Sequence, residues 1–139
     1  MNYTRRDALV IGAGAAVAAL MPFQAFADAA EDAIATFTGG ADAAEGGVEL
    51  TAPEIAENGN TVPIAVAAAG ATEIMIFATG NPNPEVIKFT FGPLSGSSAA
   101  STRCRLAGTQ DVVAVAKMAD GSFARATANV KVTIGGCGG

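Results

Sequence analysis

The sequence predicts an all-β protein: an immunoglobulin-like antiparallel β-sandwich with a short N-terminal helix and a flexible C-terminal Gly-Cys arm. Two observations support this prediction. Between residues 48 and 134, apolar and polar residues alternate with a period of two, which is typical of half-buried strands. Clusters of Gly, Pro, Asn, Asp and Ser separate these stretches, and short strands at such spacing favour a sandwich.

The first 27 residues have the features of a cleaved export signal. Arg5 and Arg6 precede a short apolar run over residues 8–20, and Ala25-Phe26-Ala27 has the small-x-small form that signal peptidase cuts. The run is too short to serve as a membrane span. The stretch from Thr4 to Leu9 resembles a twin-arginine motif, so we expect export to the periplasm by that route. The alternative is a buried N-terminal helix.

Residues 28–134 are expected to form one carrier domain that begins with a helix. Ala30, Ala33, Ile34 and Phe37 recur at helical spacing over residues 28–37. Two glycines then end the helix. The expected strands cover residues 48–51, 62–67, 73–79, 87–91, 102–106, 111–118 and 124–134, with residues 41–47 and 92–100 as loops. Residues 73–79 are apolar on both faces, which predicts burial on both sides.

The chemistry is expected in the tail, residues 135–139. Gly135 and Gly136 precede Cys137, and Gly138 and Gly139 follow it. Glycine leaves the backbone free and provides no side chain to pack, so these residues predict a swinging arm slender enough to enter a narrow cleft. The two residues after the last strand give the sulfur a reach of roughly 7 Å. Cys137 is therefore the candidate attachment site for a covalently held group.

The two cysteines leave alternatives open. A free thiol with a pKa near ~8.5 is a few per cent thiolate at neutral pH, and the tail has no basic neighbour, so we expect a partner's pocket to activate Cys137. A disulfide between Cys137 and Cys104 is one alternative in an oxidising compartment, and an intermolecular bridge through Cys137 is another. Cys104 alternates with Thr102 and Leu106 on an inward strand face, which favours a role in the core.

Composition excludes several classes of function. The net charge is −5, and it becomes −6 when Arg5, Arg6 and Asp7 leave with the signal, which argues against binding to nucleic acid or to anionic membranes. The chain has no histidine, so Ser-His-Asp hydrolases and histidine-bearing metal sites are excluded. We expect no cofactor and no catalytic residue of its own.

The pentapeptide of residues 135–139, after a long alternating strand, resembles the swinging arm of the SoxY family of sulfur carriers. The stretch from Glu57 to Ile64 (ENGNTVPI) is similar to that family's motif before its second strand. The resemblance implies that Cys137 carries sulfur intermediates of thiosulfate oxidation and that the protein is no enzyme. It also implies a SoxZ-like partner subunit, a SoxAX-like haem enzyme, a SoxB-like hydrolase and, where present, a sulfur dehydrogenase.

Other interpretations compete with the carrier. An exported β-sandwich module could dimerise through a Cys137 disulfide. A thiol oxidoreductase is disfavoured because the sequence has no Cys-x-x-Cys pair, and copper delivery because Met and Cys lack ligand spacing. Arg103 and Arg105 either form a basic site for sulfur oxyanions or lie on a solvated strand face.

Overall fold

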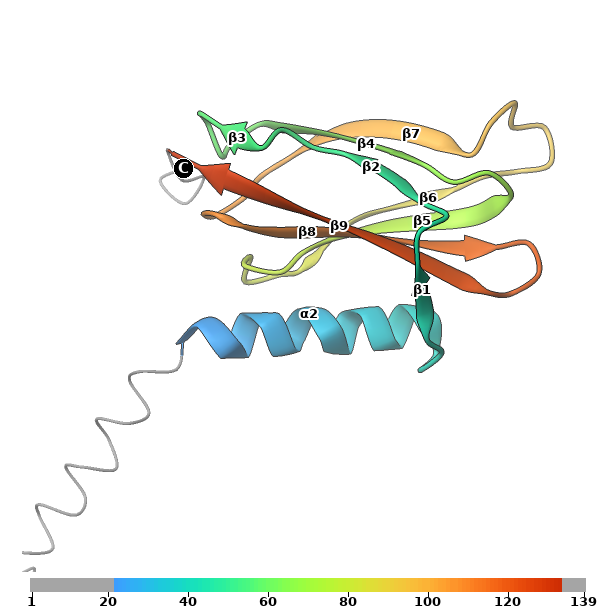
Figure 1. The fold of residues 1–139 in the computed structure, drawn as a ribbon, viewed down its shortest axis with the longest axis horizontal. Coiled ribbons are helices and arrows are strands. Elements are labelled where there is room, and N and C mark those ends of the chain that lie inside the picture. The colour runs from blue at the N-terminus through green and yellow to red at the C-terminus, as the bar shows by residue number, and fades with distance from the viewer. Residues whose placement is uncertain (1–21, 134–139) are drawn as a thin grey trace, which may run out of the picture.

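Two β-sheets pack face to face, and a helix lies along the outside of the larger sheet (Figure 1). This arrangement is seen in a computed structural model, which describes residues 22–133. The buried apolar side chains fall into two groups, one between the sheets and a smaller one between the larger sheet and the helix. The predicted sandwich is confirmed for these residues.

Helix α2 (Pro22–Thr38) is longer than predicted. It begins six residues before Asp28, so the expected cleavage position after Ala27 lies inside it. Gly39 and Gly40 end it with positive φ angles of 67° and 85°, a conformation that glycine adopts without steric cost. Within the described residues, no helix is long and apolar enough to cross a membrane.

The larger sheet has the order β1-β9-β8-β5-β6, and β3 also pairs with β9. The β9–β8, β8–β5 and β5–β6 pairs are antiparallel, whereas β1 and β3 run parallel to β9. The strands are β1 (Ala43–Glu45), β3 (Ile55–Ala56), β5 (Ala71–Ala78), β6 (Glu85–Thr90), β8 (Gln110–Met118) and β9 (Phe123–Val132).

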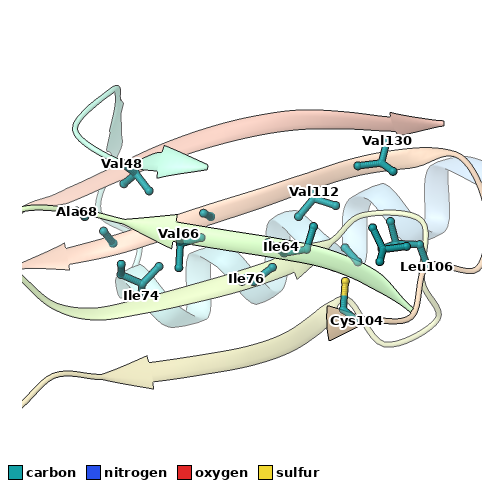
Figure 2. Packing of buried hydrophobic residues seen from close by; sticks show 14 of the residues in the cluster. Val48, Ile64, Val66, Ala68, Ile74, Ile76, Cys104, Leu106, Val112 and Val130 are labelled. Atoms are coloured by element: carbon teal, nitrogen blue, oxygen red, sulfur yellow. The ribbon is translucent and has the colours of Figure 1, made fainter. Parts of the chain in front are cut away.

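The smaller sheet has the order β2-β4-β7 and is antiparallel throughout. Its strands are β2 (Glu49–Thr51), β4 (Val62–Ala67) and β7 (Ala99–Cys104). Along β4, Val62, Ile64 and Val66 are buried and alternate with more exposed residues, as the period of two predicts. These three side chains belong to the core between the sheets, where Figure 2 labels Ile64 and Val66 together with Cys104 of β7.

The seven predicted strands are all present, with two differences. Strand β7 begins at Ala99 and ends at Cys104, so part of the predicted loop is strand and Leu106 lies beyond it. Strands β1 and β3 were not predicted, and β1 lies inside the predicted loop of residues 41–47. Both are short and join an edge of β9 through backbone pairing, which leaves little signature in side-chain alternation.

Strand β5 is buried on both faces, as predicted. Ile74 and Ile76 point into the core between the sheets, and both are fully buried. Phe77 points to the other side, where it packs with Ile34 of α2. The ring of Phe37 meets that of Phe77 edge to face, with centroids 6.3 Å apart. The helix thus gives the larger sheet a second buried face.

Candidate functional site

The predicted site residues, Cys137 and its four neighbouring glycines, lie outside the described residues. The structure does describe the segment from which they continue, the last residues of β9. In Figure 1 this end of β9 lies beside β3. We therefore build the site from the contacts of residues 131–133.

Strand β3 holds one side of this segment. Ile55 is paired with Lys131 and Ala56 with Val132, in parallel. The Lys131 amide donates to the Glu54 carbonyl at 2.9 Å, and the Thr133 amide donates to the Ala56 carbonyl at 3.1 Å.

Thr109 holds the other side, because the ladder between β8 and β9 ends at the pair of Gln110 and Val130. The Thr109 hydroxyl accepts a hydrogen bond from the Val132 amide at 3.0 Å and donates to the Val132 carbonyl at 3.4 Å. One side chain thus contacts both backbone groups that a further strand residue would have paired.

The side chain of Thr133 adds a third set of contacts. Its hydroxyl lies 3.5 Å from the Ala56 carbonyl and 3.3 Å from the Glu57 carbonyl, and it donates to both. Glu57 opens the turn that the sequence marked as a motif, and the Gly59 carbonyl in that turn accepts from the Leu106 amide at 2.8 Å. The motif therefore connects Thr133, just after β9, to Leu106, just after β7.

Sequence reasoning did not identify Thr109 or Thr133 as site residues. Thr109 stands in a predicted loop and Thr133 among the polar residues of the alternating last strand, and nothing in the local pattern distinguishes either from other exposed threonines. Their role depends on the pairing of segments that are far apart in the chain, which the sequence pattern did not predict.

Cys104 lies in the core, as predicted, and forms no disulfide within residues 22–133. Its residue is 7% exposed, and it lies near the same end of the core as Leu106 and Ile64 (Figure 2). Burial raises the pKa of the Cys104 thiol, since the desolvated thiolate is disfavoured. Cys104 is therefore protonated at neutral pH and shielded from reagents, the opposite of what a nucleophile requires.

Arg103 and Arg105 are both exposed. Arg103 lines an open cavity of about 540 Å³ on the outer face of the smaller sheet, together with Thr51, Ser101 and Thr102. Arg105 is not among the residues that line this cavity. Neither arginine forms an ion pair within residues 22–133, and the two side chains do not line this cavity together.

Metal chemistry finds no support in this part of the chain. Among the described residues, no group of three or more Cys, Asp or Glu side chains is placed to hold a metal ion. The acidic side chains are spread over the surface.

Comparison with known proteins points to one family. The chain matches the family model described as sulfur oxidation protein SoxY over residues 34–137. The sulfur carrier protein SoxY from Chlorobium limicola f thiosulfatophilum is similar in structure, with a TM-score of 0.68 and 40% identity over 78% of this chain and 99% of that chain. No curated protein sequence matches.

More distant structures share the fold. The superoxide reductase (neelaredoxin) from Ignicoccus hospitalis has a TM-score of 0.55 at 16% identity, and covers 63% of this chain and 80% of that one. A putative superoxide reductase from Thermotoga maritima has a TM-score of 0.53 at 16% identity, over 69% of this chain and 89% of that one. At this identity the likeness concerns the β-sandwich alone. Unlike these distant structures, the family match and the 40% identical structure show that the chain belongs to the SoxY family of sulfur oxidation proteins.

Proposed function

We propose that this protein is a periplasmic, non-enzymatic carrier that holds sulfur intermediates covalently on Cys137 during thiosulfate oxidation. The observation that carries the proposal is the family match, which extends to residue 137 and so includes the cysteine. The 40% identical structure belongs to a sulfur carrier protein. The glycines on both sides of Cys137 and the export signal of residues 1–27 add support from the sequence.

Loading is an oxidative coupling at the Cys137 sulfur. The thiolate and the terminal sulfur of thiosulfate form a disulfide bond, giving a cysteine S-thiosulfonate, and two electrons leave to a SoxAX-like haem enzyme. Because Cys137 has no basic neighbour in the tail, the thiolate forms inside the partner's pocket. A nucleophile with an ordinary pKa becomes reactive when such a pocket stabilises its anion.

Unloading begins with hydrolysis by a SoxB-like enzyme. Water adds to the sulfonate sulfur, the bond between the sulfonate and the sulfane sulfur breaks, and sulfate and two protons are released. A persulfide remains on Cys137. A sulfur dehydrogenase, where present, removes six electrons from the sulfane sulfur while three water molecules supply oxygen, which leaves a sulfonate on the cysteine sulfur. A second hydrolysis then releases sulfate and regenerates the thiol.

The described domain is suited to hold the arm as a stable scaffold and not to catalyse this chemistry. Two buried groups of side chains hold the sandwich and its helix together, and Cys104 is inaccessible within it. The carrier acts with a SoxZ-like subunit as a heterodimer, and twin-arginine export, which transports folded cargo, would let the pair cross the membrane together.

The intact mass of the protein from the periplasm of thiosulfate-grown cells tests the proposal. We expect sulfur-containing adducts that map to Cys137 and disappear on treatment with a reductant. An unmodified Cys137, or one found only in a bridge to Cys104, would contradict the carrier function.

Substitution in the tail separates the carrier from a module that dimerises through Cys137. Gly138→Val adds a branched side chain next to the cysteine, and we expect thiosulfate loading by the partner enzyme to fall at least tenfold because the arm no longer fits a narrow cleft. A dimerising cysteine would tolerate this change. The rate of Cys137 disulfide formation in the same variant is the control.

A further inference from the structure

We propose that Thr109 and Thr133 are positioning residues that fix residues 131–133, the end of β9 and the residue after it, and so set where the arm begins. We refer to their contacts with Val132, Ala56 and Glu57 as the arm clamp. The inference builds on the proposed function, because the starting point of the arm matters only if Cys137 is delivered to a partner.

Residues 131–133 lie beyond the main β8–β9 ladder. Backbone pairing with β8 stops at Val130, and the Thr109 hydroxyl takes over at Val132, 3.0 Å from its amide nitrogen. On that side the strand end depends on one side chain. Replacing that hydroxyl by a methyl group of the same shape would leave the Val132 amide without this acceptor.

The support from β3 on the opposite side is limited. Strand β3 has two residues, and Ile55 is 59% exposed, whereas Ala56 is 6% exposed. So short a strand has little burial to hold it in place. The Thr133 hydroxyl, which donates to the carbonyls of Ala56 and Glu57, strengthens this junction.

The clamp determines the length of the tether. With the clamp closed, Cys137 is four residues beyond Thr133, so its backbone reaches at most about 14 Å. With the clamp open, Cys137 is seven residues beyond Val130, and the reach is about 24 Å. Effective concentration at a target falls roughly as the −3/2 power of tether length, so opening lowers the local concentration of the thiol about twofold.

Spin-label distances measure the tether directly. One nitroxide is attached to Cys137 and a second to an introduced cysteine at Thr127, an exposed position within β9, in a Cys104→Ala background. We expect Thr109→Val/Thr133→Val to widen the distance distribution by up to roughly one third, the limit that the square root of tether length gives for a fully open clamp. Hydrogen exchange at Val132 should accelerate by between about twofold and tenfold, the factor that one net hydrogen bond represents.

Two controls separate positioning from general stability. Thr109→Ser/Thr133→Ser keeps both hydroxyls and should keep the narrow distribution of the parent. Thr90→Val makes the same substitution at an exposed position at the end of β6 and should leave both readouts unchanged. Thermal unfolding should shift little in the clamp variants, because Thr109 and Thr133 are both exposed.

A distance distribution that stays unchanged in the Thr109→Val/Thr133→Val variant would overturn the proposal, and so would equal widening in Thr109→Ser/Thr133→Ser. If the double variant is unfolded, Thr109→Val by itself is judged by the same criteria. These readouts do not require thiosulfate. A clamp that behaves as expected, in a protein whose Cys137 never carries sulfur, would instead contradict the proposed function.

Discussion

The two cysteines of this chain lie in regions of opposite character. Cys104 ends strand β7 in the core between the sheets, where it is 7% exposed. Cys137 lies among four glycines, residues that offer no side chain for packing. Burial raises the pKa of Cys104 and keeps its sulfur from reagents. The comparison teaches that surroundings assign the role, since the same side chain fills space in one region and, under the proposed function, carries sulfur in the other.

The largest expected effect is on sulfur transfer. Cys137→Ser should abolish thiosulfate-dependent respiration, because a serine hydroxyl does not form the disulfide bond of the S-thiosulfonate. The urea midpoint of the variant should match that of the parent. Full activity in the variant would contradict the role proposed for Cys137, because sulfur would then be carried by another residue.

A matched pair of leucines tests the core near Cys104. Leu106 is fully buried, whereas Leu94 is fully exposed in the loop between β6 and β7. Leu106→Ala should lower the free energy of unfolding by about 2–5 kcal/mol through lost burial and a residual cavity. Leu94→Ala should change it by less than about 0.5 kcal/mol. Urea unfolding of both variants checks this, and equal effects would contradict the assigned core.

Cys104→Ala should have a smaller effect. We expect a loss of about 1 kcal/mol, as for a small buried side chain, with loading of Cys137 unchanged. Mass spectrometry of the variant measures the loading of Cys137, and its urea midpoint measures the loss of stability. If the folded variant lost all sulfur transfer, Cys104 would have a role beyond packing.

The smallest effect concerns pH. Burial raises the folded-state pKa of Cys104 above that of an ordinary thiol, so its contribution to stability is complete below the unfolded pKa and is lost as the pH rises through the folded pKa. The parent should therefore lose stability above about pH 9 relative to Cys104→Ala. Urea midpoints of both proteins between neutral and alkaline pH provide the measurement. If the urea midpoints of the two proteins changed in parallel with pH, burial would not raise the pKa of the Cys104 thiol.

Much of the fold follows from local pattern. Alternation located every long strand, and the doubly apolar stretch of β5 correctly predicted burial on both faces. Helix α2 was placed correctly in its second half and begins earlier than expected, because the amphipathic pattern marks the face that packs and not the first residue of the helix. Cys104 was assigned to the core for the same reason that β7 was found: its neighbours alternate.

The sequence by itself determined the strands other than β1 and β3 and the burial of Cys104, because each depends on neighbouring residues and their periodicity. The tertiary structure decided which segments meet. The parallel pairing of β3 with β9, the Thr109 contact across the end of the ladder and the covering of Phe77 by α2 all join residues distant in the chain. Backbone groups are chemically the same in every residue, so such pairing leaves no mark in the local sequence.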